Sequence, residues 1–340
     1  MIDLLGTALS SLRIAGTTLL HEEYSPPWSV AVPSSHELAR VLGLGKSSQA
    51  VAFHLVRKGA FTLRVSAHEL HRVSAGEMAI VFGGAAHTMS DGRAVAPCPV
   101  ERLIGTYRPD RAGRRSSPNG TRLVCGVFSV ANAELHPLFA SLPPVLLARP
   151  SGEGGSWQSN QVAELLVREL DRREPGGPYA ISRLVELLCL EALRLHVSTS
   201  ESMIPGFLRG LTDSATSRAM RAIMERPGVA ISVATLARSA GLSPSRFAAR
   251  FREAVGQSPI EFATRWRMDL AARWLVETDW SVGEIADRVG YESPAAFSRA
   301  FSRLAGQSPK SWRSSRRGVE PEQQRDARVP RGRKEQRAGG

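Results

Sequence analysis

Arginine residues on one face of two short segments are the strongest chemical signal in the sequence. Arg246 and Arg250 lie four residues apart, a spacing that places both side chains on one face of a helix. Arg299 and Arg303 repeat this arrangement further along the chain. A guanidinium group is a planar fork of hydrogen-bond donors that fits a phosphate or the edge of a guanine. The pattern therefore predicts two helical faces that contact double-stranded DNA.

These arginine pairs belong to an internal repeat. The segment 232–241 is echoed by 281–290, and the tetrapeptide GQSP recurs unchanged at 256–259 and 306–309. Each copy begins with a serine suited to cap a helix and reaches a glycine suited to a sharp turn. A Ser-Pro pair then starts a second helix, in which two phenylalanines four residues apart form the buried face. The repeat therefore predicts two helix-turn-helix units.

A longer helix is expected between the two copies. Trp266, Leu270 and Trp274 recur at intervals of four within 262–277. A continuous helix of about 16 residues would be ~24 Å long. Such a helix can hold two recognition helices ~34 Å apart, about one turn of DNA, on the same face of the duplex.

From Leu211 to Trp312 the sequence resembles the AraC/XylS family of transcription regulators. The stretch 285–301, followed by GQSP, is similar to the signature of that family. The resemblance implies two subdomains joined by a linker helix, each inserting its third helix into an adjacent segment of the major groove. Carried over position by position, it implies base-facing residues at Ser245, Arg246, Ala249, Ala295, Ser298 and Arg299.

The predicted DNA-contacting set consists of these six residues together with Arg250 and Arg303. The sequence differs from proteins that recognise bases through many hydrogen bonds, because it has alanine at positions 249, 295 and 296. Alanine can touch a thymine methyl group but donates no hydrogen bond. We therefore expect base recognition to depend on few arginines.

The chain before the repeat has two further zones. From Pro27 to Leu147, short runs rich in Val, Ile and Phe are separated by glycine and proline, which predicts a β-barrel or β-sandwich. At 157–197 the apolar spacing becomes helical, with a strong breaker at 174–178. We expect a helical hairpin there. Its leucine stripe is either an ordinary core face or a dimer interface, with Leu188 as the candidate contact.

The segment Gly76–Asp91 resembles the second motif of the cupin family, with Gly84 and His87 at the expected intervals. The pair Lys58-Gly59 is similar to the turn that closes the first cupin motif. The paired histidines and the glutamate expected before that turn are missing, and Ala52 stands at the glutamate position. The resemblance implies a sensory cupin domain of the kind attached to many such regulators.

His54, His87 and Cys125 form the tentative effector pocket of this domain. His54 lies two residues beyond Ala52 on the same strand face, so it can meet His87 inside the barrel. Two histidines without a carboxylate make a weak metal site, since catalytic zinc usually has three protein ligands. We therefore predict no metal ion and no cofactor. Cys125 is either a buried core thiol or a sensor of oxidants or electrophiles.

The composition agrees with a nucleic-acid-binding protein. The formal net charge is +12, which implies a polyanionic partner. The chain has three cysteines, too few for a disulfide framework. No apolar run of ~18 residues is present to span a membrane, and the N-terminal stretch makes a poor signal peptide. We expect a cytoplasmic protein.

Together these features predict a multidomain α+β protein. Residues 1–150 are expected to form a cupin-like sensory domain, 151–210 a helical linker and dimerisation region, 211–315 the DNA-binding domain, and 316–340 a disordered basic tail. We expect a transcription regulator without enzymatic activity, controlled by a small molecule or a redox signal. Its expected partners are promoter DNA, RNA polymerase, the effector and, if the leucine stripe is an interface, a second copy of the chain.

Two other functions fit parts of the sequence. A cupin metalloenzyme with secondary DNA binding would need the metal ligands that the first cupin motif lacks. An architectural DNA-binding protein would have little use for two separate reading helices and a large additional domain.

Overall fold

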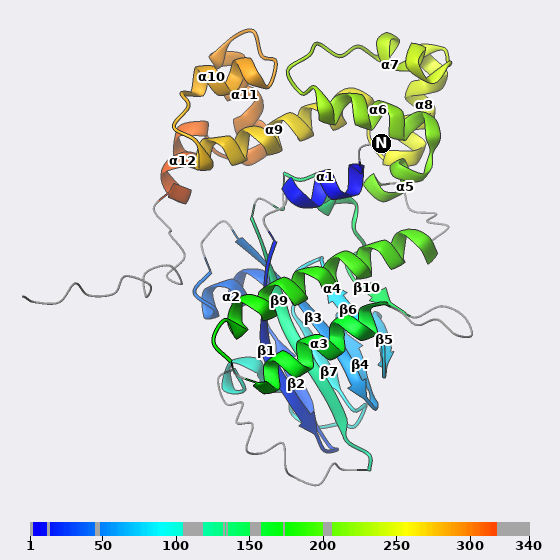
Figure 1. Cartoon of the computed structure of the whole chain (residues 1–340), viewed down its shortest axis with the longest axis vertical. Coiled ribbons are helices and arrows are strands. Elements are labelled where there is room, and N and C mark those ends of the chain that lie inside the picture. The colour runs from blue at the N-terminus through cyan, green and yellow to red at the C-terminus, as the bar shows by residue number, and fades with distance from the viewer. Residues whose placement is uncertain are drawn as a thin grey trace, which may run out of the picture.

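The computed structural model describes residues 3–11, 14–44, 48–104, 118–131, 133, 135–149, 158–172, 174–199 and 206–317. Strands lie only in the lower half of the molecule, where they form two sheets, and the upper half is helical (Figure 1). This arrangement confirms the predicted fold class. Among the helices within these ranges, none is long and apolar enough to cross a membrane.

Each sheet has five strands. The first sheet has the order β1-β9-β3-β6-β10, with bounds β1 Ile14–Tyr24, β9 Thr121–Ala131, β3 Ser48–Lys58, β6 Met78–Val81 and β10 Leu146–Ala148. The second sheet has the order β5-β4-β7-β2-β8, with bounds β5 Leu70–Ser74, β4 Ala60–Arg64, β7 His87–Ser90, β2 Ser29–Val32 and β8 Cys98–Pro99. Apolar residues from both sheets form one core, as a sandwich or small barrel requires.

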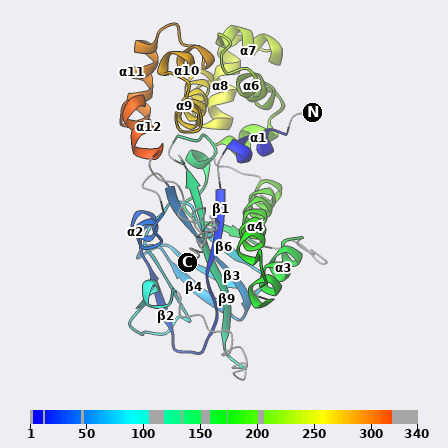
Figure 2. The ribbon, with the colours of Figure 1, turned by 60° about the vertical axis from the view of Figure 1, so that its left-hand side comes forward.

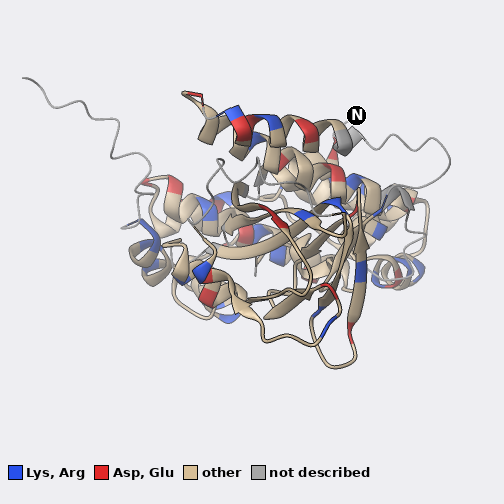
Figure 3. Cartoon of the chain, turned by 90° about the horizontal axis from the view of Figure 1, so that it is seen from below, with Lys and Arg blue, Asp and Glu red and all other residues tan. Residues whose placement is uncertain are grey.

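The first sheet is buried on both faces. In β3, Ala52 and Val56 belong to the core between the sheets, whereas Phe53 and Leu55 belong to the core on the opposite side. Successive residues of a strand face opposite sides, so both sides of the sheet are covered. In the coloured ribbon, Lys, Arg, Asp and Glu are more frequent on the helices than on the strands (Figure 3).

Two helices, α3 (Gln158–Arg172) and α4 (Gly177–Thr199), cover the outer face of the first sheet (Figure 2). They confirm the predicted hairpin. Helix α4 crosses β1 so closely that a Cβ on Gly16 would lie 2.3 Å from Cγ1 of Val185. Leu188 is fully buried in the core beneath α4. Of the two alternatives for Leu188, the structure therefore supports the core face, because the sheet already covers this side chain. The hairpin packs against the first sheet, and its predicted role as a linker and dimerisation region stays a prediction.

The elements that were not predicted include α1 (Leu4–Ser11), β1 and α2 (Ser35–Val41). Strand β1 mixes threonine, histidine and glutamate with its apolar residues, so it lacks a clear apolar run. Helix α2 begins with a capping box between Ser34 and Glu37. That Ser-x-x-Glu pattern is the sequence signal that could have predicted it. Two short 3-10 helices are η1 (Val100–Arg102) and η3 (Phe139–Ser141).

The helical half contains two units joined by α9 (Pro259–Glu277). The first unit consists of α5 (Phe207–Thr212), α6 (Ser214–Glu225), α7 (Val233–Ala240) and α8 (Pro244–Val255). The second consists of α10 (Val282–Arg288), α11 (Pro294–Ala305) and α12 (Pro309–Arg317). Helix α12 includes Arg316 and Arg317, so the tail expected at 316–340 does not begin at Arg316. Its remainder, 318–340, lies outside the described residues.

The sheet half and the helical half share a continuous core. Leu4 and Ala8 of α1 and Leu138 belong to the same buried cluster as Phe207 and Trp266 of the helical half. The contact between the halves is therefore apolar and closely packed.

Replacing Leu188 by alanine should lower the free energy of unfolding by about 2–5 kcal/mol, because the surrounding core cannot fully collapse into the cavity. Leu187 is the matched control: it precedes Leu188 but is 38% exposed. Leu187→Ala should change stability by less than about 1 kcal/mol. Chemical denaturation followed by circular dichroism measures both values. Equal stability of Leu188→Ala and Leu187→Ala would contradict the burial of Leu188.

Candidate nucleic-acid interface and barrel interior

The first helix-turn-helix unit is formed by α7 and α8, and local chemistry explains its bounds. Ser232 caps α7 because its Oγ accepts a hydrogen bond from the Thr235 backbone N–H at 3.1 Å. Gly241 ends α7 with a φ of 69°, a left-handed conformation that favours glycine. Ser243 then caps α8, whose first residue is Pro244.

The second unit, α10 and α11, repeats this design with a stronger start. Ser281 and Glu284 form a capping box, in which Ser281 Oγ accepts the Glu284 N–H at 3.1 Å and the Glu284 carboxylate accepts the Ser281 N–H at 2.7 Å. Gly290 has a φ of 78°, and Ser293 caps α11. The two predicted helix-turn-helix units are confirmed.

The predicted DNA-contacting residues lie on the open side of α8 and α11. In each helix, two phenylalanines four residues apart are buried against the rest of the unit. The residues exposed on the other side are Ser245, Arg246, Ala249, Arg250, Ala295, Arg299 and Arg303, and Ser298 is partly buried. This geometry fits insertion of each helix into a major groove. Which of these side chains touch DNA stays a prediction.

Arg250 has a partner within the chain. Its Nε and Nη2 lie 2.8 and 2.6 Å from Oδ2 of Asp213. Asp213 also caps α6, because its Oδ1 accepts the backbone N–H groups of Ala215 and Thr216 at 3.1 and 2.8 Å. Burial acts to raise the pKa of Asp213, but hydrogen bonds from Arg250 and Thr216 hold it below its usual value. Arg250 thus fastens α8 to α6, a role that sequence spacing did not indicate.

Arg246 and Arg299 are placed differently. Within the described part of the chain, neither side chain forms a hydrogen bond or an ion pair, and both are exposed. The first unit therefore offers Arg246, and the second Arg299, as an unpaired guanidinium group on the face that would meet DNA, and Arg303 of the second unit is likewise exposed and unpaired in the described chain.

Two histidines meet inside the barrel, as predicted. Nε2 of His54 and Nε2 of His87 are 2.8 Å apart, and both side chains are buried. Nδ1 of His87 lies 3.0 Å from the Ala85 carbonyl oxygen, so the His87 proton resides on Nδ1. Nε2 of His54 is then the donor between the rings, and its Nδ1 is an acceptor without a hydrogen-bond partner among the described residues. Burial lowers the pKa of both rings, so the pair is neutral.

Cys125 faces the same interior. The register of β3 and β9 places Cys125 opposite His54, and cross-strand partners point to the same side of a sheet. Burial raises the pKa of the Cys125 thiol, and the charge of Glu22 raises it further. The neutral histidines supply no positive charge to stabilise a thiolate. The geometry therefore favours a core thiol over a sensor of oxidants.

Tyr24 and Trp28 complete this interior and were not predicted. Their rings stack with centroids 4.9 Å apart, and the Phe61 ring lies 6.5 Å from Trp28 and 6.1 Å from His54. The Tyr24 Oη and Trp28 Nε1 atoms are buried and, like His54 Nδ1, have no hydrogen-bond partner among the described residues. Buried polar atoms of this kind are satisfied in proteins by a water molecule or a small polar ligand.

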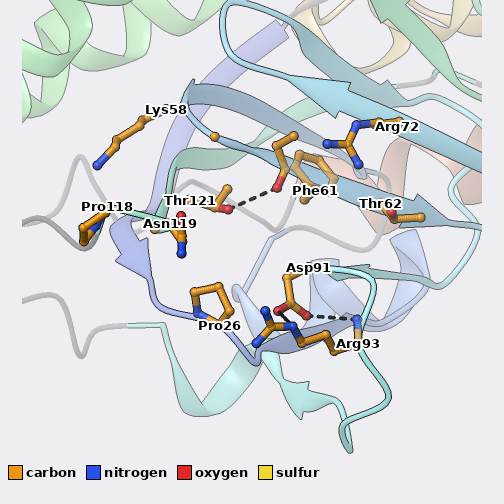
Figure 4. A pocket seen from close by; sticks show the side chains of 13 residues that line it. Pro26, Lys58, Phe61, Thr62, Arg72, Asp91, Arg93, Pro118, Asn119 and Thr121 are labelled. Carbon is orange, nitrogen blue, oxygen red and sulfur yellow. Dashed lines mark hydrogen bonds and ion pairs between the residues drawn. The ribbon is translucent and has the colours of Figure 1, made fainter.

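A pocket of about 400 Å³ opens beside Phe61 (Figure 4). The charged side chains that line it are Lys58, Arg72, Arg93 and Asp91. Asp91 Oδ2 forms an ion pair with Arg93 Nε at 3.6 Å. Lys58 Nζ lies 3.8 Å from Glu23 Oε1, so Arg72 is the lining cation that has no ion pair among the described residues. Its charge makes the pocket electrically suited to an anionic ligand.

Both halves of the chain match known protein families. A family model described as Cupin matches residues 3–198, and a model described as a helix-turn-helix domain matches 236–315. A putative AraC-like transcription regulator of Streptomyces antibioticus is 30% identical over 269 residues, which cover 78% of this chain and 87% of that protein. The HTH-type transcriptional regulator AlkR of Acinetobacter baylyi is 26% identical, over 78% of this chain and 89% of its own length.

The solved structures that match include a DNA-binding domain. The DNA-binding domain of AdpA, in complex with a target DNA, is 32% identical and covers 33% of this chain and 99% of that domain, with a TM-score of 0.31. The cupin match spans both sheets and the α3–α4 hairpin, and the helix-turn-helix match spans both recognition helices. The chain belongs to the AraC-like family of DNA-binding transcription regulators and carries an N-terminal cupin domain.

Proposed function

We propose that the protein reads promoter sequence mainly through Arg246 and Arg299. One observation supports this choice: Arg246 and Arg299 are exposed, unpaired within the described chain and opposite the buried phenylalanines. Arg303 is also exposed and unpaired, but it lies one turn further from the N-terminal part of α11, and it is the N-terminal part of a recognition helix that contacts base edges. An unpaired guanidinium group gives up no internal hydrogen bond when it binds a guanine, whereas Arg250 would give up its bonds to Asp213. The exposed Ser245, Ala249, Ala295 and Arg303, with Ser298, are proposed as supporting contacts.

Replacing Arg299 by alanine should weaken binding to the specific operator about 10- to 100-fold, because a bidentate arginine–guanine contact is worth ~1–3 kcal/mol. Binding to a random duplex should change little. Arg246→Ala should act in the same way on the other half of the site. Arg40, exposed on α2, provides the charge-matched control Arg40→Ala.

Titration of each variant with an operator duplex, selected from genomic fragments by the purified protein, and with a random duplex measures both affinities. Equal losses on the two duplexes would show that Arg299 contacts phosphate and does not read bases.

We further propose that the cupin domain controls DNA binding through the linker helix α9. Leu135, between β9 and β10, packs with Met268 and Ala271 of α9 in one buried cluster. His136 is completely buried, and its ring lies edge-on to Trp266 with centroids 5.7 Å apart. A ligand that moves this segment would also move the helix that carries both recognition units.

The contact between the domains carries little charge at its centre. Burial, assisted by the positive charge of Arg273, lowers the pKa of His136 to about 3. In the same region, burial raises the pKa of Asp269 to about 7, although Arg273 lies 3.7 Å away and acts in the opposite direction. The neutral His136 and the Arg273–Asp269 ion pair are both enclosed in this closely packed contact. Close packing of this kind is typical of a domain interior and less so of a transient surface.

Replacing Leu135 by alanine should speed amide hydrogen exchange in α9, because removal of a buried leucine commonly costs about 2–5 kcal/mol of packing. Leu135 is 2% exposed, whereas Leu70 on β5 is 50% exposed and gives the matched control Leu70→Ala. Hydrogen exchange of the full chain, resolved by peptide, measures the effect. Unchanged exchange in α9 of Leu135→Ala would contradict transmission through this contact.

The effector that we propose is a small organic anion. The cations Lys58, Arg72 and Arg93 that line the pocket support this class of ligand, with Asp91 as the only acid lining it in the described structure. Phe61 lines the same pocket and also contacts the aromatic interior, so a ligand bound there is in contact with the barrel core. A thermal-shift series with carboxylates at constant ionic strength tests the class, and no shift by any of them would contradict it.

We also propose that the protein has no enzymatic activity and acts at promoters in the cytoplasm, together with RNA polymerase. The names of its relatives support this role. A cupin metalloenzyme would need a third ligand beside His54 and His87, and the described residues contain no metal-binding group of three His, Cys, Asp or Glu side chains. Formation of a homodimer stays a proposal, with an interface other than the buried Leu188.

A further inference from the structure

The two helix-turn-helix units touch each other away from the linker helix. The loop between α6 and α7 reaches toward α10 and α11 (Figure 1). A Cβ placed on Gly290 would lie 2.6 Å from the Gly228 carbonyl oxygen, and a Cβ on Gly228 would lie 2.8 Å from the Arg288 carbonyl oxygen. Real Cβ atoms do not approach backbone so closely. Glycine at both positions therefore permits a direct backbone contact between the units.

An arginine of the linker helix fastens this contact. Arg267 Nε donates to the Pro227 carbonyl at 2.7 Å, and its Nη2 donates to the Val229 carbonyl at 2.8 Å. The guanidinium group therefore holds the carbonyls on both sides of Gly228. Burial lowers the pKa of Arg267, and the charge of the nearby Tyr291 acts to raise it. Because Tyr291 follows Gly290, the Arg267 side chain also lies near the second unit's side of the contact.

The position of the contact relates it to DNA reading. Gly228 lies in the loop before α7, and Gly290 lies in the turn before α11. The contact therefore joins the loop that precedes the first helix-turn-helix to the turn of the second. Helix α9 packs with the first unit through its N-terminal part and with the second unit through its C-terminal part. A single helix that joins two units can still bend between them. The Gly228–Gly290 contact adds a second connection, and two connections fix an angle as well as a distance.

We propose that Arg267, Gly228 and Gly290 form a brace that fixes the spacing and angle of the two recognition helices, so that the protein accepts only one spacing between the two halves of its operator. The proposal goes beyond DNA reading by Arg246 and Arg299. It makes Arg267 a positioning residue that selects operator spacing without reading a base. One inserted base pair moves the second half-site ~3.4 Å along the duplex and rotates it ~34°, a change that a rigid pair of helices cannot follow.

The test uses the full chain and a two-part operator selected from a random duplex library. Affinity is measured for the selected site and for versions with one base pair inserted or removed between its halves. The unmodified protein should lose about tenfold or more on the altered spacings, comparable to the loss of one good base contact. On the altered spacings, Arg267→Met and Gly228→Ala should lose about threefold or less of their own affinity for the selected site. Arg267→Lys keeps one donor group, so its loss should fall between these values and that of the unmodified protein.

Gly283→Ala is the matched control for Gly228→Ala. A Cβ on Gly283 would lie 3.7 Å from its nearest neighbour, which is an ordinary contact, so this variant should keep the full spacing penalty. Thermal unfolding of each variant checks that the units remain folded, and Arg267→Met decides the question if Gly228→Ala is unstable. An unchanged spacing penalty in Arg267→Met would overturn the proposal. An equal loss of affinity on every spacing would also overturn it, because that result would show that Arg267 contacts phosphate.

Discussion

Burial of the linker helix α9 is the constraint on which the rest of the structure depends. Phe262 and Trp266 pack into the core shared by the first unit and the cupin half, whereas Met268 and Leu275 pack with the second unit. A helix that is buried on several sides cannot turn without breaking one of these cores. The cupin half and both helix-turn-helix units therefore all pack against one element, α9. Close packing of this kind favours a change between distinct arrangements over gradual deformation.

The DNA-binding half was largely predictable because its structure follows from local chemistry. The start of α8 at Ser243-Pro244 and the turn at Gly241 depend on residues only a few positions apart. The internal repeat contains the same local signals a second time. Arg250 shows the limit of this reasoning. Its partner Asp213 lies 37 residues earlier, and no local pattern reveals an ion pair over that distance.

The N-terminal half was predicted less completely because distant contacts decide it. Strand alternation together with the cupin resemblance was sufficient to bring His54 and His87 together. The leucine stripe, in contrast, fitted a sheet and a second copy equally well. Strand β1 was missed because it is an edge strand, where polar residues are tolerated and the apolar run is broken. Tyr24, at the end of β1, could not be assigned to the barrel interior without it.

The separation between the buried and the open face of α8 has an evolutionary consequence. Phe247 and Phe251 hold the helix from within, while Arg246 and Ala249 lie outside the core. A change at Ala249 alters the chemistry offered to a base and leaves the packing intact, since exposed substitutions seldom cost much stability. Target preference can therefore drift by single substitutions at these outer positions. Replacement of Arg250 would also remove its bonds to Asp213 at the start of α6. Lineages that acquire new target genes are therefore expected to keep Arg250 while its neighbours vary.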